Sequence, residues 1–364
     1  MKIREKLFKF ISAGLSLLAT NPASSYDNSK FPPFQTIEPH RGFQHISIHP
    51  NDDEWLITES AEKNYLLLYC FRTGDLQRYE LPGQYKYMFA AFSPSGKKIV
   101  MVRKESLPGK MMSDRLAELK TSEIAVMNKD GSAFRVLPTT KGIIAGVTFS
   151  PDEKKIAYWI GKTIRKPGSK SLITDFDVRE YDLINDTDRL FAGPFNFTDI
   201  SGLSYLSDST IIVGAYSPRL QPGELWDYKK KFNNSEIFQF DRGQTEIPIP
   251  KFSNHYYANS PAVDGKKNIF FIDFPVNAGQ SLTKISNDGK SVSWRVPNFG
   301  SSDIYKLFAS PSGKYVAFTY GAYSINSGKG NFSIGIFRTD QETWSSLPIP
   351  FPPEGLPIVV RLIS

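Results

Sequence analysis

Short apolar runs separated by turn residues recur along the whole chain, and two kinds of run alternate. The first kind is an apolar strand, a turn of Ser, Pro, Asp or Gly, and a second apolar strand, as in "VTFSPDEKKIAYWIG". Proline presets φ at the first corner of such a turn, and Gly or Asp accepts the left-handed position. The stretches with this pattern are 46–60, 90–104, 147–161, 203–217, 259–273 and 307–321.

A second kind of run follows each of these stretches. It is a strand, a turn rich in Asp, Asn or Gly, another strand and then proline, as in "VMNKDGSAFRVLP". Each repeat therefore predicts two hairpins, or four strands. The second runs are 69–82, 126–138, 180–194, 238–250, 284–297 and 336–350. The turn anchors, which are 44 to 57 residues apart, are Pro50, Pro94, Pro151, Ser207, Val263 and Pro311.

Four strands at a period of roughly 50 residues are typical of a β-propeller blade. One blade cannot bury both its faces, whereas blades set radially cover one another. The chain is thus predicted to be all-β, a six-bladed β-propeller of four-stranded antiparallel blades. The alternative, a pair of β-sandwiches, does not require the same paired runs six times. The expected blades are 43–84, 85–142, 143–197, 198–253, 254–300 and 301–352.

The stretches 149–161 and 126–138 resemble the two halves of a TolB-type propeller repeat, a relative of the WD repeats. The resemblance extends over nearly all of the chain after its first 25 residues. It implies an envelope setting and protein partners. It covers the propeller alone, without the N-terminal α/β domain of TolB, because the first blade is expected near Phe43. The propellers of prolyl-oligopeptidase-like enzymes carry the same repeat, but they accompany a hydrolase domain.

The N-terminus resembles an export signal. Lys2, Arg4, Lys6 and Lys9 precede an apolar run at 10–19, and small residues follow. We expect a secretory signal peptide at 1–25, and hence an exported protein, periplasmic or secreted. The alternative is an uncleaved anchor, although ten residues are too few to cross a bilayer, which needs about 20.

Two short strands are predicted outside the blades, at 34–37 in the N-terminal segment 26–42 and at 357–363. Either could close the ring. The single cysteine cannot form an internal disulfide.

Charge is uneven along the chain. The connections 103–122, 161–175, 217–235 and 321–333 together hold fourteen basic and six acidic residues. They join the two hairpins of a blade, so they are expected on one face, which should attract acidic partners. The net charge of +7 for the whole chain includes a basic signal, so nucleic acid is not an expected partner.

The candidate binding residues lie in or near these connections, where aromatic and basic side chains adjoin. Such a mixture suits an acidic protein surface, a polyanionic glycan or a lipid headgroup. A solvated loop whose aromatic rings pack on the blade is the structural alternative. The candidates are Trp226, Tyr228, Lys229, Lys230, Lys231, His255, Tyr256, Arg165, Lys166 and Arg115.

Catalytic signals are weak. The chain has no G-x-S-x-G elbow, and the acid-rich stretch 175–188 lacks the glycine and closing glutamate of an EF-hand loop. His45 and His49 share one strand face, but two ligands are too few for zinc, so a core or channel-lining pair is expected.

The predicted function is therefore an exported, non-catalytic, monomeric interaction module without a cofactor. It would dock an envelope protein or an acidic glycan on its basic loop face. The alternative is a small-ligand or glycan binder, or a hydrolase- or lyase-type enzyme, that uses the axial channel.

Overall fold

All regular structure in the described part of the chain is β-strand, which confirms the predicted all-β class. The chain divides into two compact units, Met1–Pro33 and Phe34–Ser364, and every described residue belongs to the second. The computed structural model describes residues 43–59, 65–105, 122–164, 173–197, 199–216, 235–246, 251, 258–274, 279–297, 303–324, 329–347 and 359–362.

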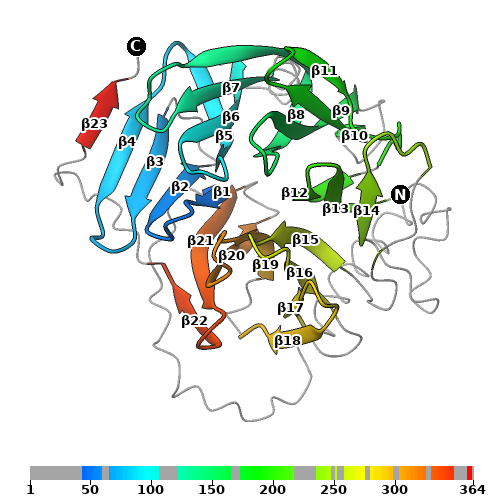
Figure 1. Cartoon of the computed structure of the whole chain (residues 1–364). Helices are drawn as coiled ribbons and strands as arrows, with labels where there is room; N and C mark the ends of the chain where they lie inside the picture. The colour runs from blue at the N-terminus through cyan, green and yellow to red at the C-terminus, as the bar shows by residue number, and fades with distance from the viewer. Residues whose placement is uncertain are drawn as a thin grey trace, which may run out of the picture. The chain divides into compact units, whose positions relative to one another are not determined.

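The first sheet joins the beginning of the described chain to its end. Its four antiparallel strands are β1 (Phe43–Ile48), β2 (Glu54–Glu59), β3 (Tyr65–Cys70) and β4 (Leu76–Glu80). The strand β23 (Val359–Leu362) pairs in parallel with β4 and forms the outer edge in Figure 1. The predicted C-terminal strand thus adds to the N-terminal sheet, whereas the predicted strand at 34–37 lies outside the described residues.

The second sheet has seven strands because one long strand serves two hairpin pairs. Residues early in β8 pair with β7, with Leu137 opposite Ile124, and later residues pair with β9, with Val147 opposite Tyr158. The sheet therefore consists of two four-stranded parts that share β8. Its strands are β5 (Tyr85–Phe92), β6 (Lys98–Glu105), β7 (Ser122–Asn128), β8 (Arg135–Phe149), β9 (Lys155–Ile164), β10 (Ile173–Asp182) and β11 (Thr187–Leu190).

Three further antiparallel sheets complete the described fold. The first of them has three described strands, and most of the fourth strand predicted there, up to residue 250, falls outside the described residues. The strands are β12 (Asp199–Ser207), β13 (Thr210–Tyr216) and β14 (Glu236–Asp241); β15 (Ala258–Val263), β16 (Ile269–Asp273), β17 (Ser281–Ile285) and β18 (Ser291–Arg295); and β19 (Asp303–Ala309), β20 (Tyr315–Ser324), β21 (Lys329–Arg338) and β22 (Thr343–Ser346).

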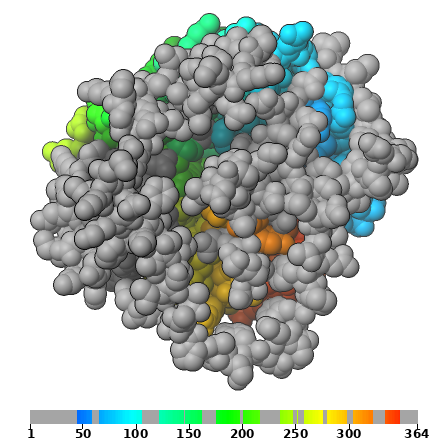
Figure 2. All heavy atoms as spheres, turned by 180° about the vertical axis from the view of Figure 1, so that it is seen from behind, coloured from blue at the N-terminus to red at the C-terminus, as the bar shows by residue number. Residues whose placement is uncertain are grey.

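The strands β1, β5, β8, β12, β15 and β19, here called the inner strands, contact one another in a closed cycle. Each contacts the next, and β19 contacts β1 again. Figure 1 shows them at the centre of the sheets, and in Figure 2 described atoms coloured green, yellow and orange adjoin at the centre of the opposite view. This order matches the radial arrangement that the repeat predicts.

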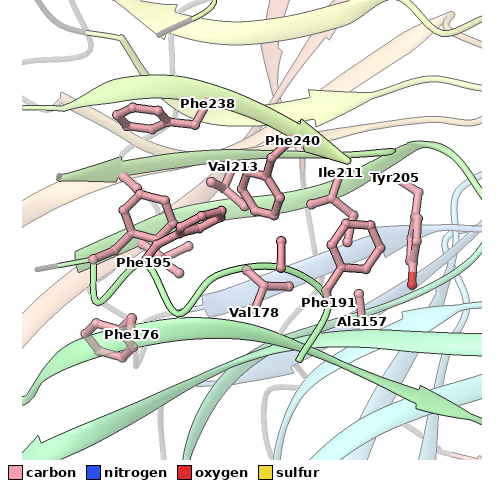
Figure 3. Packing of buried hydrophobic residues seen from close by; sticks show 14 residues of the cluster. Ala157, Phe176, Val178, Phe191, Phe195, Tyr205, Ile211, Val213, Phe238 and Phe240 are labelled. Atoms are coloured by element: carbon pink, nitrogen blue, oxygen red, sulfur yellow. The ribbon is translucent and has the colours of Figure 1, made fainter. Parts of the chain in front are cut away.

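The core lies between neighbouring sheets, so a sheet that has a neighbour on each side buries both of its faces. In the largest cluster, Phe176 and Val178 of β10 face Phe238 and Phe240 of β14 across Phe195, as Figure 3 shows. The rings of Phe195 and Phe240 meet edge to face, with centroids 5.1 Å apart. Aromatic side chains supply most apolar area per residue, and each fully buried ring stabilises the fold by roughly 1.5–3 kcal/mol.

A buried ionic cluster reinforces the same junction. Glu180 of β10 has no exposed side-chain surface, and its carboxylate accepts hydrogen bonds from Arg242 at 2.6 and 3.0 Å. The Tyr205 hydroxyl donates to it at 3.0 Å, and Arg189 adds an ion pair at 3.3 Å. The hydrogen bond to Glu180 raises the pKa of Arg242. Charge therefore links the sheet of β10 to the sheet of β12.

Candidate functional site

The structure describes the strands that carry the predicted docking face, not the docking residues themselves. All ten candidates lie outside the described residues, in 106–121, 165–172, 217–234 and 252–257. They are Arg115, Arg165, Lys166, Trp226, Tyr228, Lys229, Lys230, Lys231, His255 and Tyr256.

Strand register places the roots of the basic connections at equivalent ends of their sheets. Tyr85, where β5 begins, pairs with Glu105, the last described residue before 106–121. Asp199 likewise pairs with Tyr216, which precedes 217–234. Asp303, at the start of β19, pairs with Gly321 of β20. We call this the loop end of each sheet, and the opposite end the turn end.

The recurring Ser-Pro phrase forms the turns of the turn end. The Oγ atoms of Ser93, Ser150 and Ser310 accept hydrogen bonds from the amides five residues on, at 3.2, 2.9 and 3.1 Å. Adjacent turns also bond to each other, since the Asp152 amide donates to Asp208 at 3.1 Å. These phrases recur because each repeat needs the same pinned turn.

A cavity of about 430 Å³ lies among the inner strands. It reaches from His45, Phe89 and Lys306 near the loop end to Pro94 and Asp264 in the turns. Most of its wall is formed by apolar side chains, hydroxyls and backbone. We call it the axial cavity.

His45 is neutral in this wall. Its Nδ1 lies 3.1 Å from the Ala90 carbonyl oxygen, and the Phe89 and Phe308 rings meet it edge-on at 6.0 and 4.8 Å between centroids. Burial, reinforced by the charge of Lys306, lowers the pKa of His45 to about 3. His45 lines the cavity as expected, whereas His49 follows the end of β1 and lines a different pocket, so the two histidines do not form a channel-lining pair. The His45 imidazole is held by a carbonyl, whereas a catalytic base is usually oriented by a carboxylate.

The inner strands share an irregularity at one level of the cavity. Pairing to the second strand shifts between Met88 and Ala91 in β5 and between Ile144 and Val147 in β8, with similar shifts in the other inner strands. Bulges re-aim side chains and are common beside functional sites. Phe89 lies in this break with a positive φ of 52°, which is rare for a bulky residue.

Gly146 opens the wall to a side chain of the next strand. A Cβ on Gly146 would lie 1.7 Å from Nε1 of Trp159, so only glycine leaves room for the indole. Trp159 therefore reaches the cavity from β9 and packs on Phe176 at 5.3 Å.

Sequence reasoning missed Phe89, Gly146, Trp159 and Lys306. A signal was present for three of them, because Phe89, Gly146 and Lys306 each precede the turn serine by four residues. His45 has the same spacing from His49, which begins the first turn.

A second, open pocket lies at the turn end between β1–β2 and the turns of the next sheet. Its wall includes His49, Glu54 and Lys129. Glu54 forms an ion pair with Lys129, and Nδ1 of His49 lies 3.7 Å from the Glu54 carboxylate. Burial and then the charge of Lys129 lower the pKa of His49.

The acid-rich stretch 175–188 is engaged in the fold. Besides the bonds of Glu180, Asp188 accepts from the Tyr158 hydroxyl at 2.9 Å and pairs with Arg179 at 3.2 Å. Asp182 caps the amides of the turn that follows. Among the described residues, no group of three or more His, Cys, Asp or Glu side chains could hold a metal ion. The described part of the chain also contains no helix of the length and hydropathy needed to span a membrane.

Comparison with solved structures supports the fold. TolB from Acinetobacter baumannii aligns with a TM-score of 0.53 at 15% identity, over 83% of this chain and 62% of that chain. An oligogalacturonate lyase from Vibrio parahaemolyticus aligns with a TM-score of 0.54 at 10% identity, over 85% and 78%. The β-propeller domain of the Trilobed protease from Pyrococcus furiosus gives 0.48 at 13% identity, over 86% and 84%.

These likenesses concern the fold. No protein-family model and no curated protein sequence matches the chain. The chain spans 62% of the length of the TolB structure. The described sheets, the antiparallel pairing within each blade and the likeness to the TolB and lyase structures together give a β-propeller fold similar to that of TolB.

Proposed function

We propose that this chain is an exported, six-bladed β-propeller that acts as a non-catalytic interaction module and docks an acidic envelope protein at its loop end. The cycle of inner strands supports six blades, because the shared strand β8 divides the seven-stranded sheet into two. The basic N-terminal run supports export. The resemblance of its repeats to the TolB-type repeat implies an envelope setting.

The observation that carries the proposal is the strand register at the loop end. The predicted connections are shorter than expected, because 103–105, 161–164, 173–175, 321–324 and 329–333 belong to strands. The segments between the strands, 106–121, 165–172, 217–234 and 325–328, hold ten basic and four acidic residues and follow strand ends that are equivalent. A surface with one sign of charge speeds encounters with partners of the opposite sign and loses this advantage in salt. The turn end, in contrast, is occupied by short turns that bond to one another.

The axial cavity favours binding over catalysis as the second candidate. Its volume of about 430 Å³ would admit a small ligand. Its histidine, His45, is uncharged and lies within hydrogen-bond distance of a carbonyl oxygen. These properties favour a structural role in the cavity wall over a role as a proton donor. Small-ligand binding there is compatible with docking at the loop end.

A charge-reversal pair tests the docking proposal. In the loop variant, Lys229, Lys230 and Lys231 are changed to Glu. In the matched turn variant, Lys97, Lys154 and Lys314, which are exposed in three equivalent turns, receive the same change. Both variants alter the net charge equally, so general electrostatic effects cancel.

The measurement is capture from native envelope extract by immobilised protein, at low and high salt, followed by identification and direct titration of the captured partner. We expect an acidic protein that binds the wild type and the turn variant, and binds the loop variant at least about tenfold more weakly. Equal binding to both variants would refute docking at the loop end. Capture of acidic glycan alone would replace the protein partner with a polysaccharide.

A further inference from the structure

The indole N–H of Trp159 is a hydrogen-bond donor in the wall of the axial cavity. Trp159 is partly exposed, and its ring packs on Phe176 with centroids 5.3 Å apart. In the part of the chain that the structure describes, no group accepts a hydrogen bond from this N–H. The N–H of a buried tryptophan usually has an acceptor within the protein. The Trp159 donor is therefore available to a molecule inside the cavity.

Trp55 shows how the same fold treats an indole that it encloses. Trp55 of β2 is fully buried, and its Nε1 donates to the Asp52 carbonyl oxygen at 3.1 Å. Trp55 and Trp159 both lie on strands that pair with an inner strand. The difference is that one N–H is satisfied by the turn beside it, whereas the other lies at the cavity.

Gly146 of β8 brings the Trp159 donor to the cavity. A Cβ on Gly146 would clash with Nε1 of Trp159, so the nitrogen occupies the place of an inner-strand side chain. The φ of Gly146 is 142°, a conformation that glycine adopts and other residues rarely do. Both residues line the cavity. The inner strand thus presents an N–H from its neighbour in place of a side chain of its own.

Aromatic and aliphatic side chains share the wall with this donor. Phe89, Phe308, Leu203 and Leu307 line the cavity, whose volume is about 430 Å³. Pockets for small molecules have volumes of roughly 300–1,000 Å³ and combine an apolar wall with a few fixed polar groups. Phe89 has a left-handed backbone at φ 52°, and such strain clusters at ligand sites. Because rings pack favourably on other rings, this wall suits a planar aromatic body.

The charges of the described wall favour an uncharged ligand. Asp264 accepts hydrogen bonds from two amides of its own turn at 2.8 and 2.9 Å. Lys306 lies over the Phe89 ring at 5.3 Å and has further contacts, and Lys267 belongs to the turn after β15. His45 is neutral, because burial lowers its pKa to about 3. A charged ligand would lose its hydration in this cavity without gaining an equivalent partner beside Trp159.

We infer that the axial cavity binds a small, planar, uncharged aromatic compound with a hydrogen-bond acceptor on its edge, and that this acceptor receives the N–H of Trp159. The inference assigns a ligand class to the cavity, which carries the second candidate function, and it is independent of docking at the loop end. Failure of either proposal leaves the other standing, because the experiments below involve no protein partner.

Two probes of nearly equal shape separate the hydrogen bond from apolar contact. Quinoline carries a ring nitrogen that accepts a hydrogen bond and is uncharged at pH 7.5, and naphthalene is its counterpart without an acceptor. Titration of the full chain with each probe gives the Kd. We expect quinoline to bind about fivefold more tightly, which corresponds to one neutral hydrogen bond.

Two matched variants locate the donor. Trp159→Phe keeps an aromatic ring beside Phe176 and removes the N–H. Trp294→Phe is the control, because Trp294 is also partly exposed, packs on Phe337 at 4.8 Å and does not line the cavity. The readout is the ratio of the two Kd values, so a general change in the cavity affects both probes and cancels. We expect a ratio of about five in the wild type and in Trp294→Phe, and about one in Trp159→Phe.

A measurement on the unaltered chain keeps the inference testable if Trp159→Phe does not fold. Each of the five tryptophans gives one indole N–H resonance in the ¹H–¹⁵N spectrum of the labelled protein. The Trp159 resonance is assigned from its nuclear Overhauser contacts with the Phe176 ring. Quinoline should move this resonance downfield in a saturable manner, as the hydrogen bond forms, and should leave the Trp294 resonance in place.

Three results would overturn the inference. The first is a quinoline-to-naphthalene preference that is absent in the wild type or unchanged in Trp159→Phe. The second is a Trp159 resonance that does not move while quinoline binds. The third is no saturable binding of quinoline up to about 1 mM.

Discussion

Glu180 is a buried and His45 a partly buried titratable side chain at junctions between sheets, yet the protein handles them in opposite ways. Glu180 is surrounded by the guanidinium groups of Arg242 and Arg189 and the hydroxyl of Tyr205. His45 has one carbonyl partner, two aromatic neighbours and a nearby lysine, and it stays neutral. One junction is held by charged pairs, whereas the histidine of the other stays uncharged.

The difference follows from the chemistry of the two groups. A buried carboxylate is tolerated only when partners replace its lost hydration, and removing one partner leaves a costly charge behind. A buried imidazole can instead release its proton and become neutral, and its pKa is lowered accordingly. The Glu180 junction therefore depends on its partners, and the His45 junction depends on pH.

The largest predicted effect concerns the charged junction. Arg242→Met removes the bidentate partner of Glu180 and leaves the carboxylate buried with Arg189 and Tyr205. We expect a loss of about 3–5 kcal/mol in the free energy of unfolding, measured by urea denaturation at pH 7.5.

The matched control for this change is Arg338→Met. Arg242 lies over the ring of Phe191, 5.2 Å from its centre, and Arg338 lies over the ring of Tyr315 at 5.9 Å. The Arg338 variant therefore tests lost packing without a buried carboxylate. We expect it to cost less than about 1 kcal/mol. Similar losses in the two variants would mean that charge does not distinguish the Glu180 junction.

The sequence predicts the architecture well because each repeat encodes it locally. In the Ser-Pro turns, Ser93 and its equivalents accept a hydrogen bond from the amide five residues later, so the turn is encoded within a few residues. The alternation of apolar runs marks the strands. The partnership of Glu180 with Arg242 is different, because the two residues are 62 positions apart and meet only when adjacent sheets pack. Local patterns carry no information about such a contact.

The candidate site was harder to predict for a related reason. Lys306 and Phe89 face the cavity because of a pairing shift in their strands, which alternation alone does not reveal. Their common distance from the turn serine becomes informative only once the inner strands are known to meet. Trp159 reaches the cavity only because Gly146 has no side chain to occupy the place of its indole.

The next prediction concerns the pH dependence of stability that arises from His45. The pKa of His45 is about 3 in the folded protein and 6.5 in the unfolded chain, so the unfolded chain binds the proton more readily. Stability is therefore full above pH 6.5 and declines as the pH falls toward 3. Between pH 7.5 and 5.0, His45 should remove about 2 kcal/mol from the free energy of unfolding.

His45→Gln, which keeps a donor for the Ala90 carbonyl, isolates this contribution. Urea denaturation at both pH values should show a loss on acidification that is about 2 kcal/mol smaller in the variant than in the wild type. His49→Gln is the comparison, since the pKa of His49 is lowered too and contributes with the same sign. An unchanged acid loss in His45→Gln would show that His45 is not kept neutral by the fold.

The smallest effect concerns the hydroxyl that links three inner strands beside the axial cavity. Ser260 of β15 is buried, and its Oγ lies 2.9 Å from the Tyr305 carbonyl oxygen and 3.1 Å from that of Ser201. Ser260→Ala should cost about 1–2 kcal/mol, because a buried carbonyl loses its donor. Ser260→Gly should cost less, since its φ of 51° favours glycine and relief of strain offsets part of the lost bond. Thermal unfolding of the two variants decides the matter: an alanine variant as stable as the wild type would mean that the inner strands are held by backbone pairing and packing alone, with no contribution from this neutral polar contact.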